Sequence, residues 1–350
     1  MSFRLHGPLS YRWLSFWDLL HASATVTRDR FLGRRLVQSW TWQFEVANVF
    51  GRRHMNRAMS MSDPAEARVF EDSIAFDSPL PLRVRVENSS LPSVRGRWHC
   101  PENASRERTV LYFHGGGYAF FSAAHNQMID HIACAARSNV FSLDYRLSPE
   151  HTHPAQLEDA CGAYQALLDT GHDARRLVIA GDSAGGHLAL LLLRELRKRQ
   201  LPMPALVIGL CPWTELDADP ASLSRNDRFD WVQSAITRQF AEWVVGSDRA
   251  AWRGLSPVSF DVTGFPPIYV QAGGKEVLYD MICRFALHVA DSGGEVTLDV
   301  WADMTHDFQA YGQLLEDSRA ALSRIGDAVE HYLDGAREMP FRPLCHPAGE

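Results

Sequence analysis

The chain has 350 residues, of which 46% are hydrophobic and 22% charged, and its formal net charge is −7 at pH 7. This composition is typical of a folded globular protein with one large α/β domain or two ordinary domains. The acidic balance argues against a nucleic-acid partner, because proteins that bind nucleic acids usually carry a basic patch.

The N-terminal segment, residues 1–65, is rich in aromatic side chains and is predicted to form a helical cap. Two stripes recur at helical spacing, one made of Trp13, Phe16, Trp17 and Leu20 and one made of Val37, Trp40 and Phe44. Each stripe must cover the body of the protein, a substrate pocket or a lipid surface. Packing is the favoured interpretation over membrane contact.

Targeting and redox features are few. No run approaches the length of a membrane span, and residues 1–8 lack the apolar core of a signal peptide. We therefore expect no integral membrane segment and a cytoplasmic protein. The six cysteines show neither a CxxC pair nor the spacing of metal ligands, which predicts free thiols and no metal.

Beyond residue 65 the hydrophobic period changes to that of short strands. The first three predicted strands, residues 68–76, 82–86 and 94–99, are interpreted as the antiparallel opening of a sheet. Strands and helical stretches then alternate, which predicts a mostly parallel sheet covered by helices on both faces. These later strands are residues 109–113, 139–144, 177–180, 205–210, 268–272 and 296–301.

A long aromatic segment interrupts this alternation after residue 210. It lies at the carboxyl edge of the predicted parallel sheet, which is where ligands bind in such folds. We predict that residues 213–255 form a cap insertion and make a lid together with the N-terminal helices. The α/β core would then comprise residues 66–212 and 256–335, followed by a tail at residues 336–350.

The most informative segment is Gly181-Asp182-Ser183-Ala184-Gly185, which lies between a short apolar run and a longer leucine-rich run. This pattern predicts a strand, a sharp turn and a helix, with Ser183 at the apex. The glycines leave room where strand and helix meet, and the backbone N–H of Ala184 is unpaired at a helix N-terminus. Ser183 is therefore the predicted nucleophile of acyl transfer, and Ala184 a donor to the oxyanion.

Further oxyanion donors are predicted in the loop after the strand at residues 109–113. The loop reads His114-Gly115-Gly116-Gly117, and consecutive glycines let backbone N–H groups turn toward a ligand. We predict that the amides of Gly115 and Gly116 complete an oxyanion hole with Ala184. His114 is predicted to form structural hydrogen bonds.

The base and its orienting acid are expected on the loops after the last two strands. His306 follows the final strand, in the chain order nucleophile, acid, histidine. Glu276 and Asp280 follow the preceding strand and are one helical turn apart. Glu276 is favoured as the acid because it is nearer the strand end and so nearer to Ser183, whereas Asp280 stays open as the alternative.

These motifs resemble the hormone-sensitive lipase-like family of α/β-hydrolases, also called bacterial family IV esterases. The resemblance rests on His114 to Gly117, residues 144–151, Gly181 to Gly186, and His306 with Phe308. It implies an α/β-hydrolase fold with an eight-stranded sheet and a helical cap. It also implies a serine carboxylesterase with Ser183 as nucleophile, His306 as base and oxyanion amides from Gly115, Gly116 and Ala184.

One residue departs from the family pattern, and two other functions stay open. Family members usually carry aspartate where this chain has Glu276, which puts the identity of the acid in question more than the activity. Two rival functions share the fold: a small-molecule receptor that does not turn its ligand over, and an acyltransferase that passes the acyl group to an alcohol or amine. The presence of His306 disfavours the receptor.

The expected substrate is a small ester with a short-to-medium acyl group, and the many indoles of the lid suggest apolar or bulky groups. No organic cofactor is expected, because side chains and backbone amides supply every step. A homodimer is a further expectation from the family resemblance.

Overall fold

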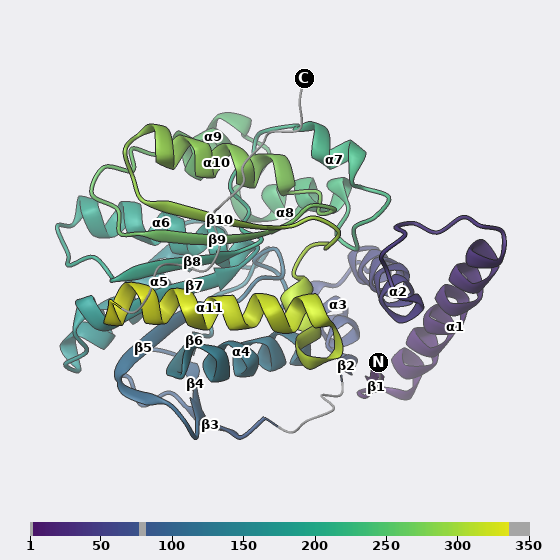
Figure 1. Ribbon diagram of the computed structural model, residues 1–350, viewed down its shortest axis with the longest axis horizontal. Helices are drawn as coiled ribbons and strands as arrows, with labels where there is room; N and C mark the ends of the chain where they lie inside the picture. Colours follow the sequence, from purple (N-terminus) through teal and green to yellow (C-terminus); the bar gives the residue numbers. More distant parts are fainter. Residues whose placement is uncertain (1–2, 77–81, 336–350) are drawn as a thin grey trace.

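The computed structural model describes residues 3–76 and 82–335, and the predicted tail at residues 336–350 lies outside them. Its centre is an eight-stranded sheet in the order β10-β9-β8-β7-β5-β6-β4-β3 (Figure 1). The strands are β3 (Val84–Asn88), β4 (Gly96–Pro101), β5 (Ser105–Phe113), β6 (Ser138–Leu143), β7 (Leu177–Asp182), β8 (Leu206–Leu210), β9 (Ile268–Gly273) and β10 (Val296–Trp301). The six strands β10, β9, β8, β7, β5 and β6, which follow one another in the sheet, pair in parallel. β4 pairs antiparallel with β3 and β6. The predicted fold class, a mostly parallel sheet, is confirmed.

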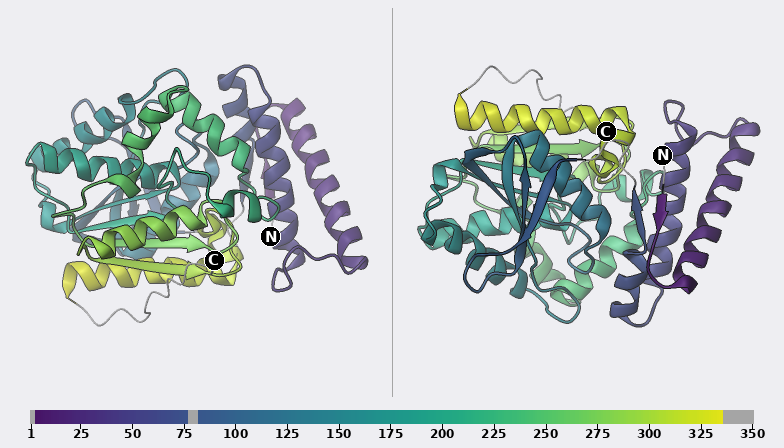
Figure 2. Two further views of the ribbon diagram at one scale, coloured as in Figure 1. Left: turned by 90° about the horizontal axis from the view of Figure 1, so that it is seen from above. Right: turned by 90° about the horizontal axis from the view of Figure 1, so that it is seen from below.

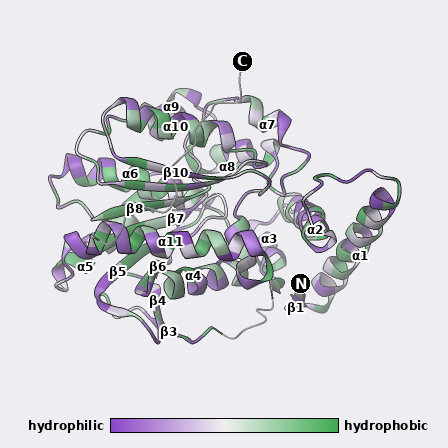
Figure 3. Cartoon of the chain, in the orientation of Figure 1, coloured by the Kyte–Doolittle hydropathy of each residue, from purple (hydrophilic) through white to green (hydrophobic). Residues whose placement is uncertain are grey.

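Alternation along the strands separates two hydrophobic layers. In β5, Val110 and Tyr112 belong to one buried cluster and Leu111 and Phe113 to the other, because successive side chains of a strand point to opposite faces. One face is covered by α4 (Ala123–Ala136) and α11 (Glu316–Asp334), and the other by α5 (Ala155–Asp169), α6 (Ala184–Lys198) and α10 (Tyr279–Asp291). Figure 3 shows hydrophobic residues concentrated in the strands and hydrophilic residues on the outer helix faces.

The segment that leads into the sheet differs from its prediction. Residues 68–76 are predicted as one strand, but helix α3 (Pro64–Glu71) includes the first of them and only Ile74–Phe76 form a strand, β2. Asp63 caps α3, whose first residue is proline, and this local start signal outweighs the β-rich composition that follows. β2 pairs antiparallel with β1 (Phe3–Leu5) in a separate two-stranded sheet.

Two long helices stand at one end of the molecule, α1 (Leu9–Phe31) outermost and α2 (Trp42–Met59) between it and the body (Figure 2). The aromatic stripe of α1 faces solvent, with Trp13 61% and Trp17 59% exposed. The predicted packing of this stripe on the body is wrong. The buried face of α1 instead consists of Ser15, Asp18, Ala22 and Val26, and these smaller side chains allow α1 to lie against α2.

The second predicted stripe is only partly helical. α2 begins at Trp42, so Val37 and Trp40 precede it. Trp40 and Phe44 are nevertheless buried together, with ring centroids 4.9 Å apart. This stripe therefore packs on the body as predicted, although the loop before α2 supplies two of its three residues.

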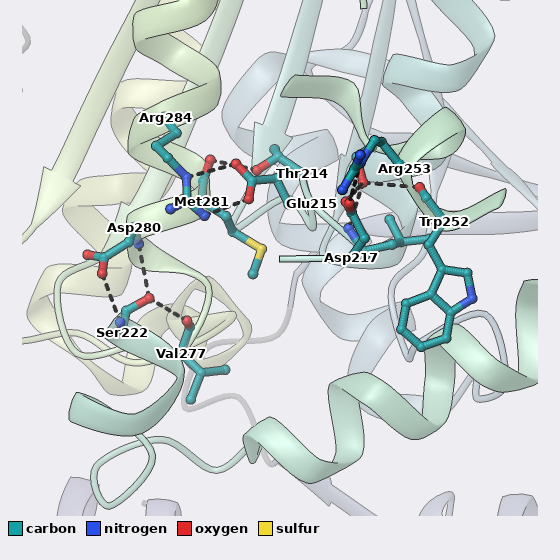
Figure 4. Close-up of polar contacts among 12 residues, drawn as sticks. Thr214, Glu215, Asp217, Ser222, Trp252, Arg253, Val277, Asp280, Met281 and Arg284 are labelled. Atoms are coloured by element: carbon teal, nitrogen blue, oxygen red, sulfur yellow. Dashed lines mark hydrogen bonds and ion pairs between the residues drawn. The ribbon is translucent and has the colours of Figure 1, made fainter. Parts of the chain in front are cut away.

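The segment between β8 and β9 contains α7 (Ala221–Arg225), α8 (Ser234–Val245) and α9 (Arg249–Leu255). Figure 4 shows its ties to α10, in which Asp280 accepts a hydrogen bond from the Ser222 backbone and Arg284 pairs with Glu215. Within the segment, Arg253 pairs with Asp217. The contacts to Asp280 and Arg284 hold the inserted segment against α10.

Three short 3-10 helices complete the described elements: η1 (Ala174–Arg176), η2 (Pro257–Ser259) and η3 (Phe308–Leu314). Across the part of the chain that the structure describes, no helix is both long and apolar enough to cross a membrane.

Candidate active site

Ser183 occupies the sharp turn between β7 and α6. It has φ 50° and ψ −116°, a conformation that L-residues rarely adopt, and α6 begins at the next residue. A Cβ built on Gly185 would lie 1.9 Å from the Phe113 carbonyl oxygen, and one on Gly181 would lie 2.4 Å from the Gly185 carbonyl carbon. The two glycines are thus required by close backbone approach, and the strained turn presents the Ser183 hydroxyl above the sheet edge.

The structure brings Glu276 and His306 together. Glu276 lies in the turn after β9 and His306 in the loop after β10, and both side chains are buried. Glu276 Oε2 lies 2.8 Å from His306 Nδ1, while its Oε1 accepts a hydrogen bond from the Gly273 backbone at 2.7 Å. A carboxylate held in this way fixes the imidazole tautomer with the proton on Nδ1, which leaves Nε2 to act as a base.

Asp280, the alternative acid, lies elsewhere. Its two oxygens accept hydrogen bonds from the Ser222 backbone and the Arg225 guanidinium of the inserted segment. Of the two candidate carboxylates, only Glu276 is a hydrogen-bond partner of His306 in the structure.

The second imidazole nitrogen meets a carboxyl that the sequence analysis did not single out. His306 Nε2 lies 3.2 Å from Asp307 Oδ2, and Asp307 adopts a left-handed conformation with φ 49°. Ser183 and His306 line the same cavity, yet within the described residues no hydrogen bond links the two side chains. Asp307 is therefore the partner of Nε2 in this state.

Several buried charges act on His306. Burial opposes its protonation, but Asp307, Glu276 and Asp230 outweigh this effect and raise the pKa of His306 to about 10. Burial also raises the pKa of Asp307 well above its ordinary value and that of Asp230 to about 7. The protons of this cluster are consequently shared among closely coupled groups.

Asp230 is a second residue that sequence reasoning missed. It lies in the inserted segment and is 1% exposed, and its two oxygens accept hydrogen bonds from the backbone of Val277 at 2.8 Å and of His306 at 3.2 Å. The neighbouring Trp231 donates its indole N–H to the His306 carbonyl at 2.7 Å. One short segment thus fixes the loops that carry both Glu276 and His306, and no local sequence pattern marks it.

The glycine loop divides into two parts. A Cβ on Gly115 would lie 2.1 Å from Asp182 Oδ2, and the Gly115 amide is one of the groups that lower the pKa of Asp182 against the larger, raising effect of burial. Gly116 and Gly117 instead line the cavity of Ser183. The structure therefore brings Gly116 to the nucleophile but turns Gly115 toward Asp182, and it adds Gly117, which the sequence analysis left out.

His114, at the start of that loop, is buried and stacks on Tyr145 with ring centroids 4.1 Å apart. The Tyr145 hydroxyl donates to the His114 carbonyl oxygen at 2.6 Å. These contacts lie beneath the glycine loop and match the structural role expected for His114.

Two cavities meet at this site. The serine cavity contains Ser183, His306, Gly116 and Gly117, and the side cavity lies beneath α2. Both are lined by Met55, Trp231 and Asp307. The two cavities are therefore adjacent, with these three residues at the boundary between them.

One group of residues has the composition of a metal site. Cys211, Glu276 and His306 each offer a ligand atom, all within 4.8 Å of one another, and this is the one such group among the described residues. Burial raises the pKa of the Cys211 thiol well above its ordinary value, which disfavours the thiolate that metal binding needs. The Glu276 to His306 hydrogen bond already accounts for the other two residues.

Comparisons with known proteins agree with the observed fold. Residues 110–310 match a family described as having the alpha/beta hydrolase fold. The chain is 36% identical over 221 residues to an acetyl-hydrolase from Streptomyces hygroscopicus (63% of this chain, 74% of the relative), and 30% identical over 233 residues to an ethyl acetate hydrolase from Pseudomonas putida (64% and 73%). The crystal structure of an esterase from the bacterial hormone-sensitive lipase family superposes with a TM-score of 0.71 and 30% identity, covering 90% of this chain and 98% of that one.

Proposed function

The chain belongs to the family with the alpha/beta hydrolase fold, among the esterases related to bacterial hormone-sensitive lipases, and we propose that it hydrolyses short-to-medium acyl esters through an acyl-enzyme intermediate. As a member of this group it is a carboxylic ester hydrolase. The observation that carries the proposal is the 2.8 Å contact between His306 Nδ1 and Glu276 Oε2 in a site that also contains Ser183. One relative is named an acetyl-hydrolase and another an ethyl acetate hydrolase, and the short groups in these names support a short ester as the substrate.

In the first half of the reaction, Ser183 Oγ attacks the ester carbonyl carbon while His306 Nε2 takes its proton. The tetrahedral intermediate collapses when the alkoxide leaves and receives that proton from His306, which yields an acyl-serine and a free alcohol. Glu276 holds the imidazole and stabilises its charged form. A water molecule then repeats the sequence and releases the carboxylic acid.

This reaction requires Ser183 Oγ to replace Asp307 Oδ2 as the partner of Nε2. Catalytic hydrogen bonds are often incomplete in a free enzyme and form only with the substrate bound. The backbone of Ser183 is fixed at the start of α6. On the serine side, the change of hydrogen-bond partner therefore requires only a rotation of the Ser183 side chain.

We propose that the oxyanion hole consists of Ala184, Gly116 and Gly117 rather than of Ala184, Gly115 and Gly116. The Gly116 carbonyl oxygen accepts hydrogen bonds from the backbones of Ala119 and Phe120, each at 2.9 Å. In a trans peptide the N–H points opposite to the C=O, so the Gly117 amide is directed away from that turn, and Gly117 lines the serine cavity. Each such donor contributes about 2.7–4 kcal/mol in the transition state.

The proposal is tested with a panel of p-nitrophenyl esters of rising chain length and with a fluorophosphonate probe. We expect turnover of short chains and covalent labelling by the wild type, and loss of both in Ser183→Ala. Ser224→Ala is the matched control, because Ser224 is exposed and lies in the inserted segment; it should behave like the wild type. Undiminished hydrolysis by Ser183→Ala would refute the mechanism.

A further inference from the structure

The side cavity contains acidic groups that the reaction does not use. Glu71 ends α3, and Asp307 follows the base; both line this cavity, with exposed fractions of 9% and 8%. Within the described part of the chain, Glu71 Oε2 and Asp307 Oδ1 are buried without a hydrogen-bond partner. Asp182, fully buried, is a third carboxyl on the same wall, and one of its oxygens accepts from Tyr112.

Buried carboxyl oxygens normally have partners, because leaving one unsatisfied costs about 1–3 kcal/mol or more. None of the described residues that line the side cavity is a lysine or an arginine. Two imidazoles are present, but burial lowers the pKa of His54 to about 4 and also lowers that of His125. The lining of the cavity therefore has three carboxyl groups and no lysine, arginine or readily protonated imidazole. The nearest cation, His306, lies outside the lining and, of the two Asp307 oxygens, contacts only Oδ2.

The remaining lining suits an alkylated cation. Phe50, Trp231 and Tyr311 supply aromatic rings, and Met55 and Ile74 supply aliphatic surface. Aromatic faces attract cations, and apolar walls bind the alkyl groups that surround a substituted nitrogen. A hydrated inorganic cation would leave these apolar walls uncovered.

We propose that the side cavity binds a protonated amine on one end of the ester substrate, through Glu71 and Asp307. This inference rests on the proposed esterase function and specifies its substrate class as amine-bearing esters. The amine N–H donates to one of the unpartnered carboxyl oxygens, while its alkyl groups contact the apolar walls. Burial and the neighbouring Asp72 raise the pKa of Glu71 to about 7, and a bound cation would lower that pKa again and favour the carboxylate.

The first experiment compares matched esters in which a protonated nitrogen replaces a CH group. Dimethylaminoethyl acetate is paired with isopentyl acetate, and ethyl dimethylaminobutanoate with its hydrocarbon isostere, so that the alcohol and acyl ends are both tested. We expect the wild type to prefer the amine in one pair by about tenfold in kcat/KM. In Glu71→Gln that ratio should fall close to one, whereas Glu66→Gln, an exposed position on α3, should keep it.

The outcomes separate the two proposals. Equal kcat/KM values within both pairs in the wild type, or a ratio retained in Glu71→Gln, would overturn the amine site while leaving the esterase intact. Failure of the wild type to hydrolyse either hydrocarbon ester would instead count against the proposed function.

A second measurement needs neither turnover nor a change at Glu71. Calorimetry on Ser183→Ala compares the binding of isopentylammonium with that of isopentanol, which offers a neutral hydroxyl donor. We expect the ammonium to bind about tenfold more tightly. Equal binding of the two would mean that the cavity accepts any hydrogen-bond donor, and the proposed selectivity for amines would be wrong.

Discussion

The catalytic edge of the sheet and the outer face of helix α1 differ in how much space they leave for side chains. At the edge, a single added methyl group on Gly185 would lie 1.9 Å from a carbonyl oxygen. On α1, the large side chains of Trp13 and Trp17 meet mainly solvent. The edge also buries carboxyl side chains such as those of Glu276 and Asp230, whereas the outer face of α1 buries none.

This difference separates two kinds of constraint. At the edge, residue type, backbone conformation and hydrogen bonding all depend on one another, so a small change should have a large effect on catalysis. On the outer face of α1 the contacts are few, and changes there should have little effect on catalysis or stability. The predictions below test this contrast, from the largest expected effect to the smallest.

The largest effect is expected for Glu276. Glu276→Ala removes the partner of His306 Nδ1 and should lower kcat about 10³- to 10⁴-fold. Asp280→Ala removes the ties to Ser222 and Arg225 and should lower the free energy of unfolding by about 1–3 kcal/mol while turnover persists. Steady-state kinetics and urea unfolding measure the two effects, and near-wild-type turnover in Glu276→Ala would reverse the assignment.

A smaller effect is expected for Asp230, which contacts the catalytic loops and not the reacting atoms. Asp230→Asn replaces one of the two accepting oxygens with an NH2 group. This group would face the backbone N–H of Val277 or His306, so one of the two hydrogen bonds is lost. The imidazole should then be less well oriented, and kcat should fall about 10- to 100-fold, because small misplacements of catalytic groups are costly. An unchanged kcat together with an altered KM would show that Asp230 affects substrate binding instead.

Asp307 should control the pH profile more than the maximal rate. His306 must be neutral to act as a base. Among the interactions with carboxyl groups that raise its pKa to about 10 against the effect of burial, the charge of Asp307 has the largest single effect. Asp307→Asn removes this influence, so the pKa of His306 should fall and activity should appear at lower pH. We expect the acidic limb of kcat/KM to shift down by about one pH unit or more; a shift to higher pH would contradict the geometry.

The sequence predicted those parts of the site that local patterns specify. Ser183 lies in a turn whose glycines can be read directly, and His306 follows from strand order alone. Asp230 could not be found in this way, because it reaches the catalytic loops from a distant segment whose path depends on tertiary packing. The proposed change from Gly115 to Gly117 in the oxyanion hole has a similar cause, because the sequence does not say which amide faces the cavity and which faces Asp182.

The same limit applies to the fold. The succession of strands along the chain and the helical layers on both faces follow from periodicity, since alternating and helical patterns are long and regular here. Residues 68–71 were predicted as part of a strand because of the β-rich composition around them. The helix start signal at Asp63 and Pro64 was given too little weight. Periodicity also located the stripe of α1 but not its direction, because an apolar face looks the same in sequence whether a partner covers it or not.

The smallest effect is expected on α1, and a matched change on α2 makes it informative. Trp13→Ser and Trp17→Ser should each change the free energy of unfolding by no more than about 0.5 kcal/mol and leave kcat/KM for a short soluble ester unchanged. Phe50→Ala on α2, by contrast, removes a side chain that is 1% exposed and lines the side cavity, and should cost about 3–5 kcal/mol. Urea unfolding of the three variants gives the comparison. A loss of more than about 2 kcal/mol in either tryptophan variant would mean that the stripe is covered in solution, since an exposed indole has too few contacts to supply that much stability.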